Sequence, residues 1–105
     1  MDKRAHIIRE KLESTLFFEV TIKPTNYFTH LVVQSTNKLT DREYYLIELE
    51  GNIITVYDYN NTTRGIENMR LTTRTSEAIN YILSKERKTI LKNVKNLLKK
   101  VDKLD

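Results

Sequence analysis

Hydrophobic and polar residues alternate most regularly over residues 43–59, and this pattern predicts two antiparallel strands. Gly51-Asn52 divides the segment near its middle, and this dipeptide suits a tight two-residue turn. If the turn pairs Glu50 with Ile53, one face of the hairpin is apolar and belongs to the core. The other face is a mixed surface that carries three tyrosines: Tyr44, Tyr57 and Tyr59.

Helical spacing marks the start of the chain, over residues 2–14. Asp2 is a suitable N-cap, because its carboxylate can accept hydrogen bonds from backbone N–H groups of the first turn. A helix of this length is marginal by itself, so we expect it to pack against a sheet. The apolar face of this helix consists of Ala5, Ile8, Leu12 and, beyond the helix, Leu16.

Two more strands are expected between this helix and the hairpin, over residues 16–23 and 27–35. The segment between them, residues 24–26, begins with proline and has the composition of a turn. A three-residue turn there places His30 opposite Val20, on the apolar face of the strand pair.

A weaker fifth strand is predicted over residues 66–73, with Met69 and Leu71 facing inward. No glycine or proline interrupts the chain from Ser76 to Asp105, which predicts a helix about 44 Å long. An eight-residue strand spans only about 27 Å. The helix must therefore break near Ser84–Lys88, or its end extends past the sheet and packs on another molecule.

The apolar residues at the end of this helix follow steps of four and three residues, the spacing of a coiled-coil seam. Two interpretations of this seam are open. In the first, it covers the chain's own sheet; in the second, it pairs two copies of the chain as a homodimer. The seam consists of Ile90, Val94, Leu97, Val101 and Leu104.

The order of the elements predicts an α+β fold in a single domain, residues 1–105, with an N-terminal helix, a five-stranded mainly antiparallel sheet and a long C-terminal amphipathic helix. Strands that cluster between two helices argue against repeated βαβ units. The 105 residues suffice for one hydrophobic core without disulfides, and the chain has no cysteine.

Composition adds an expectation about the source of the chain. Residue types with A- and T-rich codons dominate, which is typical of low-GC bacteria, their phages and other mobile elements. No apolar run approaches the roughly 18 residues of a membrane span, and the first residues lack the apolar stretch of a signal peptide. We therefore expect a soluble protein in the cytoplasm of a host cell, with no membrane association.

The positive charge is concentrated in the last helix. Residues 1–75 carry ten Lys or Arg and ten Asp or Glu, whereas residues 76–105 carry eight against four. Five lysines recur at steps of three and four residues, so they form one continuous stripe on the helix, which either contacts a polyanion or is a solvated face. The stripe consists of Lys85, Lys88, Lys92, Lys95 and Lys99, with Arg64, Arg70 and Arg74 as auxiliary contacts.

The residues that could support catalysis are few. Neither histidine, His6 nor His30, has metal-ligand spacing, and the chain contains no phosphate-binding glycine loop or nucleophile motif. Asp58 is the one carboxylate that the hairpin register puts on an apolar face, near a strand end where we expect solvent to reach it. The sequence therefore predicts no enzyme, no metal site and no cofactor.

Two functional hypotheses follow. The first is a small binding protein that contacts nucleic acid through the lysine stripe, by electrostatic attraction with little sequence preference. The second is a protein-binding inhibitor or adaptor that docks on a host or viral protein, for example a host defence nuclease complex, through the basic helix and the tyrosine-bearing sheet face. Its anchor is the tyrosine-bearing sheet face, because exposed tyrosines are typical of protein interfaces and the nearby glutamates repel phosphates. Alternatively, the N-terminal helix or another strand covers this face.

Overall fold

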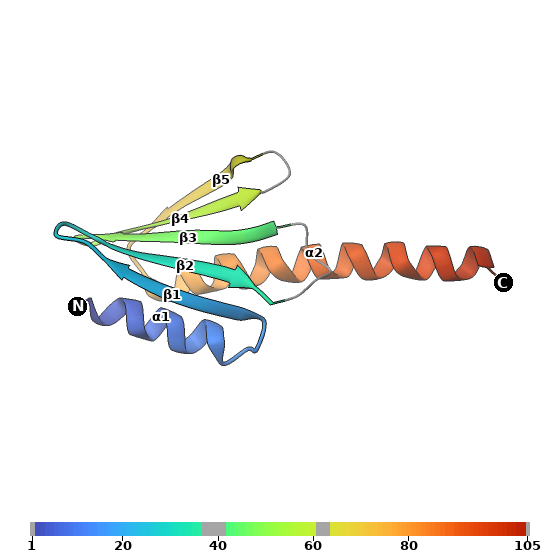
Figure 1. The fold of residues 1–105 in the computed structure, drawn as a ribbon, viewed down its shortest axis with the longest axis horizontal. Coiled ribbons are helices and arrows are strands. Elements are labelled where there is room, and N and C mark those ends of the chain that lie inside the picture. The colour runs from blue at the N-terminus through green and yellow to red at the C-terminus, as the bar shows by residue number, and fades with distance from the viewer. Residues whose placement is uncertain (1, 37–41, 61–63, 105) are drawn as a thin grey trace.

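Five antiparallel strands form one sheet in chain order, and both helices lie on the same face of it (Figure 1). The computed structural model describes residues 2–36, 42–60 and 64–104, except for the side chains at positions 42, 43, 60, 89, 90, 93 and 102–104. This arrangement of one antiparallel sheet and two helices confirms the predicted α+β fold. The elements are α1 (Lys3–Glu13), β1 (Phe18–Pro24), β2 (Thr29–Ser35), β3 (Arg42–Glu50), β4 (Ile53–Asn60), β5 (Gly65–Thr72) and α2 (Thr75–Leu104).

The first helix begins as predicted. The Asp2 side chain accepts a hydrogen bond of 2.9 Å from the backbone N–H of Arg4, and the guanidinium of Arg4 binds the same carboxylate at 2.6 Å. The prediction that Leu16 continues the apolar face of α1 is wrong, because this side chain is 83% exposed. Leu16 has a φ of 65°, which turns the chain from α1 into β1 and points the residue away from the core. The buried face of α1 consists of Ala5, Ile8 and Leu12.

The β3–β4 hairpin has the predicted register. Glu50 pairs with Ile53 across the turn, and Gly51 has the left-handed φ of 56° that the turn requires. Every second residue of each strand therefore faces the helices. The hydrophobic core lies between the helices and this inner face, where the sheet contributes Phe18, Val20, Leu31, Val33, Tyr45, Ile47, Leu49, Ile54 and Val56.

The turn between β1 and β2 is longer than predicted. Thr25 and Phe28 close a four-residue turn, in which the backbone N–H of Thr25 donates to the carbonyl of Phe28 at 2.8 Å. His30 consequently pairs with Lys23 instead of Val20 and lies on the outer face of the sheet. The predicted position of His30 on the apolar face is therefore wrong.

The prediction for β5 is also wrong in the direction of its side chains. Met69 pairs with Tyr57, and Leu71 pairs with Thr55, so both apolar side chains lie on the outer face. The inward positions of β5 near the helix take polar residues, among them Thr72, which is buried.

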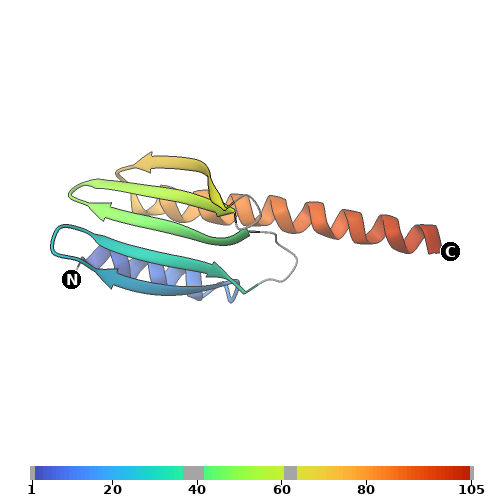
Figure 2. The ribbon, with the colours of Figure 1, turned by 45° about the horizontal axis from the view of Figure 1, so that its top comes forward.

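The last helix is continuous from Thr75 to Leu104, so the break considered near Ser84–Lys88 does not occur. Its first three turns pack on the sheet through Ala78, Ile79 and Ile82. The remainder projects past the end of the sheet, which gives the molecule extents of 57 × 28 × 20 Å (Figure 2). No helix among the described residues is both long and apolar enough to cross a membrane.

Candidate binding surfaces

A buried glutamate marks the place where α2 leaves the sheet. Glu86 is 2% exposed, and its carboxylate accepts hydrogen bonds from Ser35 at 2.7 Å and from the Tyr45 hydroxyl at 3.1 Å. These contacts join α2 to the end of β2 and the start of β3. Glu86 is not among the site residues predicted from the sequence, although its position four residues after Ile82 on the buried helix face was a usable signal.

Asp58 forms a second polar contact between the sheet and α2. The prediction that solvent reaches this carboxylate is wrong, because Asp58 is fully buried. Its Oδ2 lies 3.6 Å from the Lys85 ammonium and accepts a hydrogen bond of 3.4 Å from the Tyr81 hydroxyl. The same ammonium lies 5.5 Å from the centre of the Tyr81 ring. Lys85, the first member of the predicted lysine stripe, is thus engaged in holding α2 to β4.

The other four lysines of the stripe are exposed on the projecting part of α2. Their spacing of four, three and four residues puts them on one side of the helix, over about 17 Å. Within the described part of the chain, no acidic side chain forms an ion pair with any of them. We call this surface the lysine face; it consists of Lys88, Lys92, Lys95 and Lys99.

The side of the projecting helix opposite the lysine face is apolar. Three residues of the predicted seam have described side chains there, and all three are exposed, so these three do not cover the chain's own sheet. Leu91 and Leu98 widen this surface. We call it the apolar stripe; the exposed fractions are 53% at Leu91, 37% at Val94, 47% at Leu97, 58% at Leu98 and 54% at Val101. The side chains of the other predicted seam residues, Ile90 and Leu104, lie outside the description.

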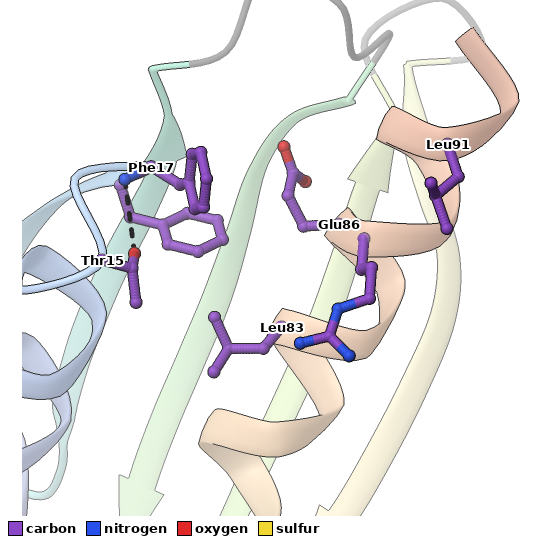
Figure 3. Close-up of a pocket in the computed structure, with 7 residues that line it drawn as sticks. Thr15, Phe17, Leu83, Glu86 and Leu91 are labelled. Carbon is purple, nitrogen blue, oxygen red and sulfur yellow. Dashed lines mark hydrogen bonds between the residues drawn. The ribbon is translucent and has the colours of Figure 1, made fainter. Parts of the chain in front are cut away.

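A hollow of about 330 Å³ adjoins the stripe where α2 passes the start of β1 (Figure 3). Leu83 on α2 and Phe17 on the chain before β1 point toward one another across it. Leu91 lines the hollow and also belongs to the apolar stripe, so the two surfaces are continuous. The lining residues are Thr15, Phe17, Phe18, Leu83, Glu86, Arg87 and Leu91.

The three predicted tyrosines gather on the outer face of the sheet, which neither helix covers. The alternative in which the N-terminal helix covers this face is therefore wrong. The rings of Tyr44 and Tyr59 stack with centroids 4.5 Å apart and an angle of 13° between planes. The Tyr57 hydroxyl donates to Glu48 at 3.3 Å. Partial burial, and then the charge and hydrogen bond of Glu48, raise the pKa of the Tyr57 phenol above its usual value.

Aliphatic side chains extend this outer face beyond the tyrosines. Their contribution from β5 was missed in the sequence because Met69 and Leu71 were assigned to the core. Of the predicted arginines, Arg64 borders a shallow hollow on this face beside Tyr59, whereas Arg70 and Arg74 are exposed elsewhere along β5 and after it. The exposed aliphatic residues of the face are Ile53, Ile66, Met69 and Leu71.

The described residues contain no group of His, Cys, Asp or Glu side chains placed to hold a metal ion. Comparison with known proteins gave no further guide to function. No protein family, no curated protein and no solved structure matches this chain.

Proposed function

We propose that this chain is a non-catalytic binding protein whose lysine face contacts the phosphate backbone of a nucleic acid. The observation that supports the proposal is the exposure of four lysines on one side of a helix that projects past its own sheet. A cation on a projecting helix can approach a phosphate without steric obstruction by the rest of the chain. The contacts would be electrostatic and nearly independent of sequence, because ammonium groups on phosphates do not read bases.

The number of contacts sets an expectation for the salt dependence. If all four lysines neutralise a phosphate on duplex DNA, log K falls against log salt concentration with a slope of about −3.6. The same contacts on a single strand give a slope of about −2.8. Arg64, Arg70 and Arg74 would steepen the slope if the nucleic acid also reaches the sheet.

Fluorescence anisotropy with labelled duplex DNA, single-stranded DNA and RNA tests the proposal, between about 50 and 200 mM salt. The decisive variant combines Lys88→Glu, Lys92→Glu and Lys95→Glu. The matched control is a second triple variant that changes the net charge equally at exposed positions away from the lysine face: Lys3→Glu, Lys11→Glu and Lys23→Glu.

The proposal requires that the first variant loses binding and that the control keeps most of it. Equal losses in both variants would show that only net charge matters and would contradict a dedicated face. Circular dichroism of each variant verifies that the helices are retained, and unchanged binding by the first variant would refute the proposal.

A second candidate function rests on the uncovered outer face of the sheet. Exposed aliphatic residues beside tyrosines are typical of the centre of a protein interface. In this alternative, the chain is an inhibitor or adaptor that docks on a host or viral protein. The variant Met69→Asp with Leu71→Asp alters this face without touching the core. It should lose a protein partner that wild-type protein retains after nuclease treatment, whereas Thr21→Asp on the distant strand β1 should retain it.

A further inference from the structure

We infer that the apolar stripe and the adjoining hollow bind a second copy of this chain, with the two projecting helices antiparallel. The structure provides the surface in one continuous piece. The stripe runs along the helix beyond the sheet, and Leu91 connects it to the hollow beside Phe17 and Leu83. An exposed apolar surface of this extent, bordered by lysines, is typical of an interaction site.

The spacing along the stripe identifies the kind of partner. Steps of four and three residues keep one side of a helix facing another helix over successive turns. A second copy of α2 presents the same spacing over the same length. Charge favours this partner as well, because Val94, Leu97 and Val101 lie opposite the lysine face, so pairing leaves the lysines of both copies in solvent.

The position of the hollow selects the antiparallel orientation. Phe17 and Phe18 lie beside Leu83 and Leu91, so the α1–β1 connection occupies the side of α2 that the stripe faces. In a parallel pair, the two copies of this connection would meet at the same level and keep the helices apart. In an antiparallel pair, the folded parts lie at opposite ends, and only the projecting helices run side by side.

An antiparallel register also accounts for the hollow. In one such register, Val94 of one copy packs beside Leu97 of the other. Position 100 of each copy then lies at the level of Leu91 of its partner. The end of each helix then approaches the hollow of the other copy and covers Phe17, which is half exposed in the single chain. Each copy contributes the same surface to the interface, as a two-fold dimer requires.

The mass in solution is the first test, measured by light scattering and sedimentation without nucleic acid. Wild-type protein should have twice the 12.5 kDa mass of the chain at micromolar concentration. The variant Val94→Asp with Leu98→Asp should be monomeric and folded, because both side chains are exposed in the single chain. The control Lys92→Asp with Asn96→Asp adds two aspartates to the same helix away from the stripe and should stay dimeric.

Single-cysteine variants test the orientation, since the chain has no cysteine of its own. Leu91→Cys and Val101→Cys proteins, when mixed and oxidised, should form disulfides between the two variants. In the antiparallel register, two Leu91→Cys residues are about 14 Å apart along the helices, too far for a disulfide. Self-crosslinking of each variant without mixed product would show a parallel pair and overturn the inference.

A wild-type chain that stays monomeric at high micromolar concentration would overturn the inference completely. The partner of the apolar stripe would then be another protein or a lipid surface. Because these measurements contain no nucleic acid, their failure leaves the proposed function of the lysine face untouched. Conversely, a dimer that does not bind nucleic acid would support the inference and refute the proposed function.

Discussion

The contact between Tyr45 and Glu86 should be one of the most sensitive points of the fold. Tyr45 is fully buried and donates its hydroxyl proton to the Glu86 carboxylate at 3.1 Å. A hydrogen bond to a charged group contributes about 1.5–3 kcal/mol to stability. The substitution Tyr45→Phe removes this donor from a carboxylate that is also buried, and we expect the free energy of unfolding to fall by about 2 kcal/mol.

A double-mutant cycle separates this contact from the general effect of removing a hydroxyl group. In a Glu86→Leu background, the carboxylate is gone, so the additional change Tyr45→Phe should cost about 0.5 kcal/mol or less. The coupling energy between the two positions should then be about 1.5 kcal/mol. Additive effects, within about 0.5 kcal/mol, would refute the reasoning.

Urea denaturation followed by circular dichroism measures each member of the cycle. For an m-value of about 2 kcal/mol per molar, a loss of 2 kcal/mol lowers the midpoint by about 1 M. The substitution Tyr27→Phe is the control, because this side chain is 86% exposed on the β1–β2 turn. Its midpoint should shift by less than about 0.25 M, which corresponds to the 0.5 kcal/mol typical of surface changes.

Three further predictions concern local features. Asp2→Ala should lower the free energy of unfolding by about 1 kcal/mol in thermal unfolding, because a helix cap is lost. Arg4 lowers the pKa of Asp2, so this stabilisation is complete above the ordinary pKa of 3.8 and is lost as the pH falls through the lowered value; the variant should lose less stability in acid. Gly51→Ala should lower the free energy of unfolding by about 1–2 kcal/mol in the same assay, since a residue with a Cβ is strained at a φ of 56°. Glu48→Gln should lower the ionisation midpoint of Tyr57 in an ultraviolet absorbance titration.

The parts of the fold that sequence analysis predicted correctly are those that local chemistry determines. The pattern over residues 43–59 determines the β3–β4 register because Gly51 permits the left-handed turn and because a slip of one residue would expose the apolar face. The N-terminus of α1 was predictable for a similar reason. The Asp2 cap acts within one turn of the helix and depends on no distant residue.

The errors arose where a distant contact or an additional residue decides the outcome. One more residue in the β1–β2 turn moves His30 to the outer face. In β5, Met69 and Leu71 face outward because the strand follows the pairing with β4 and not its own hydrophobicity. The burial of Asp58 depends on Lys85 and Tyr81, which follow it in the chain by more than twenty residues.

The projecting part of α2 connects the two proposals physically. An unsupported helix of this length is marginally stable in water, and lysines four residues apart repel each other at about 0.2–0.5 kcal/mol per pair. Burial of the apolar stripe against a second copy would hold the helix in the conformation that aligns the lysine face. Phosphates on the lysine face would in turn remove the repulsion that opposes helix formation. By thermodynamic linkage, each event should therefore strengthen the other by the same factor. The dimer should dissociate at lower protein concentration when nucleic acid is present, and the Val94→Asp with Leu98→Asp variant should bind nucleic acid more weakly although it retains all four lysines.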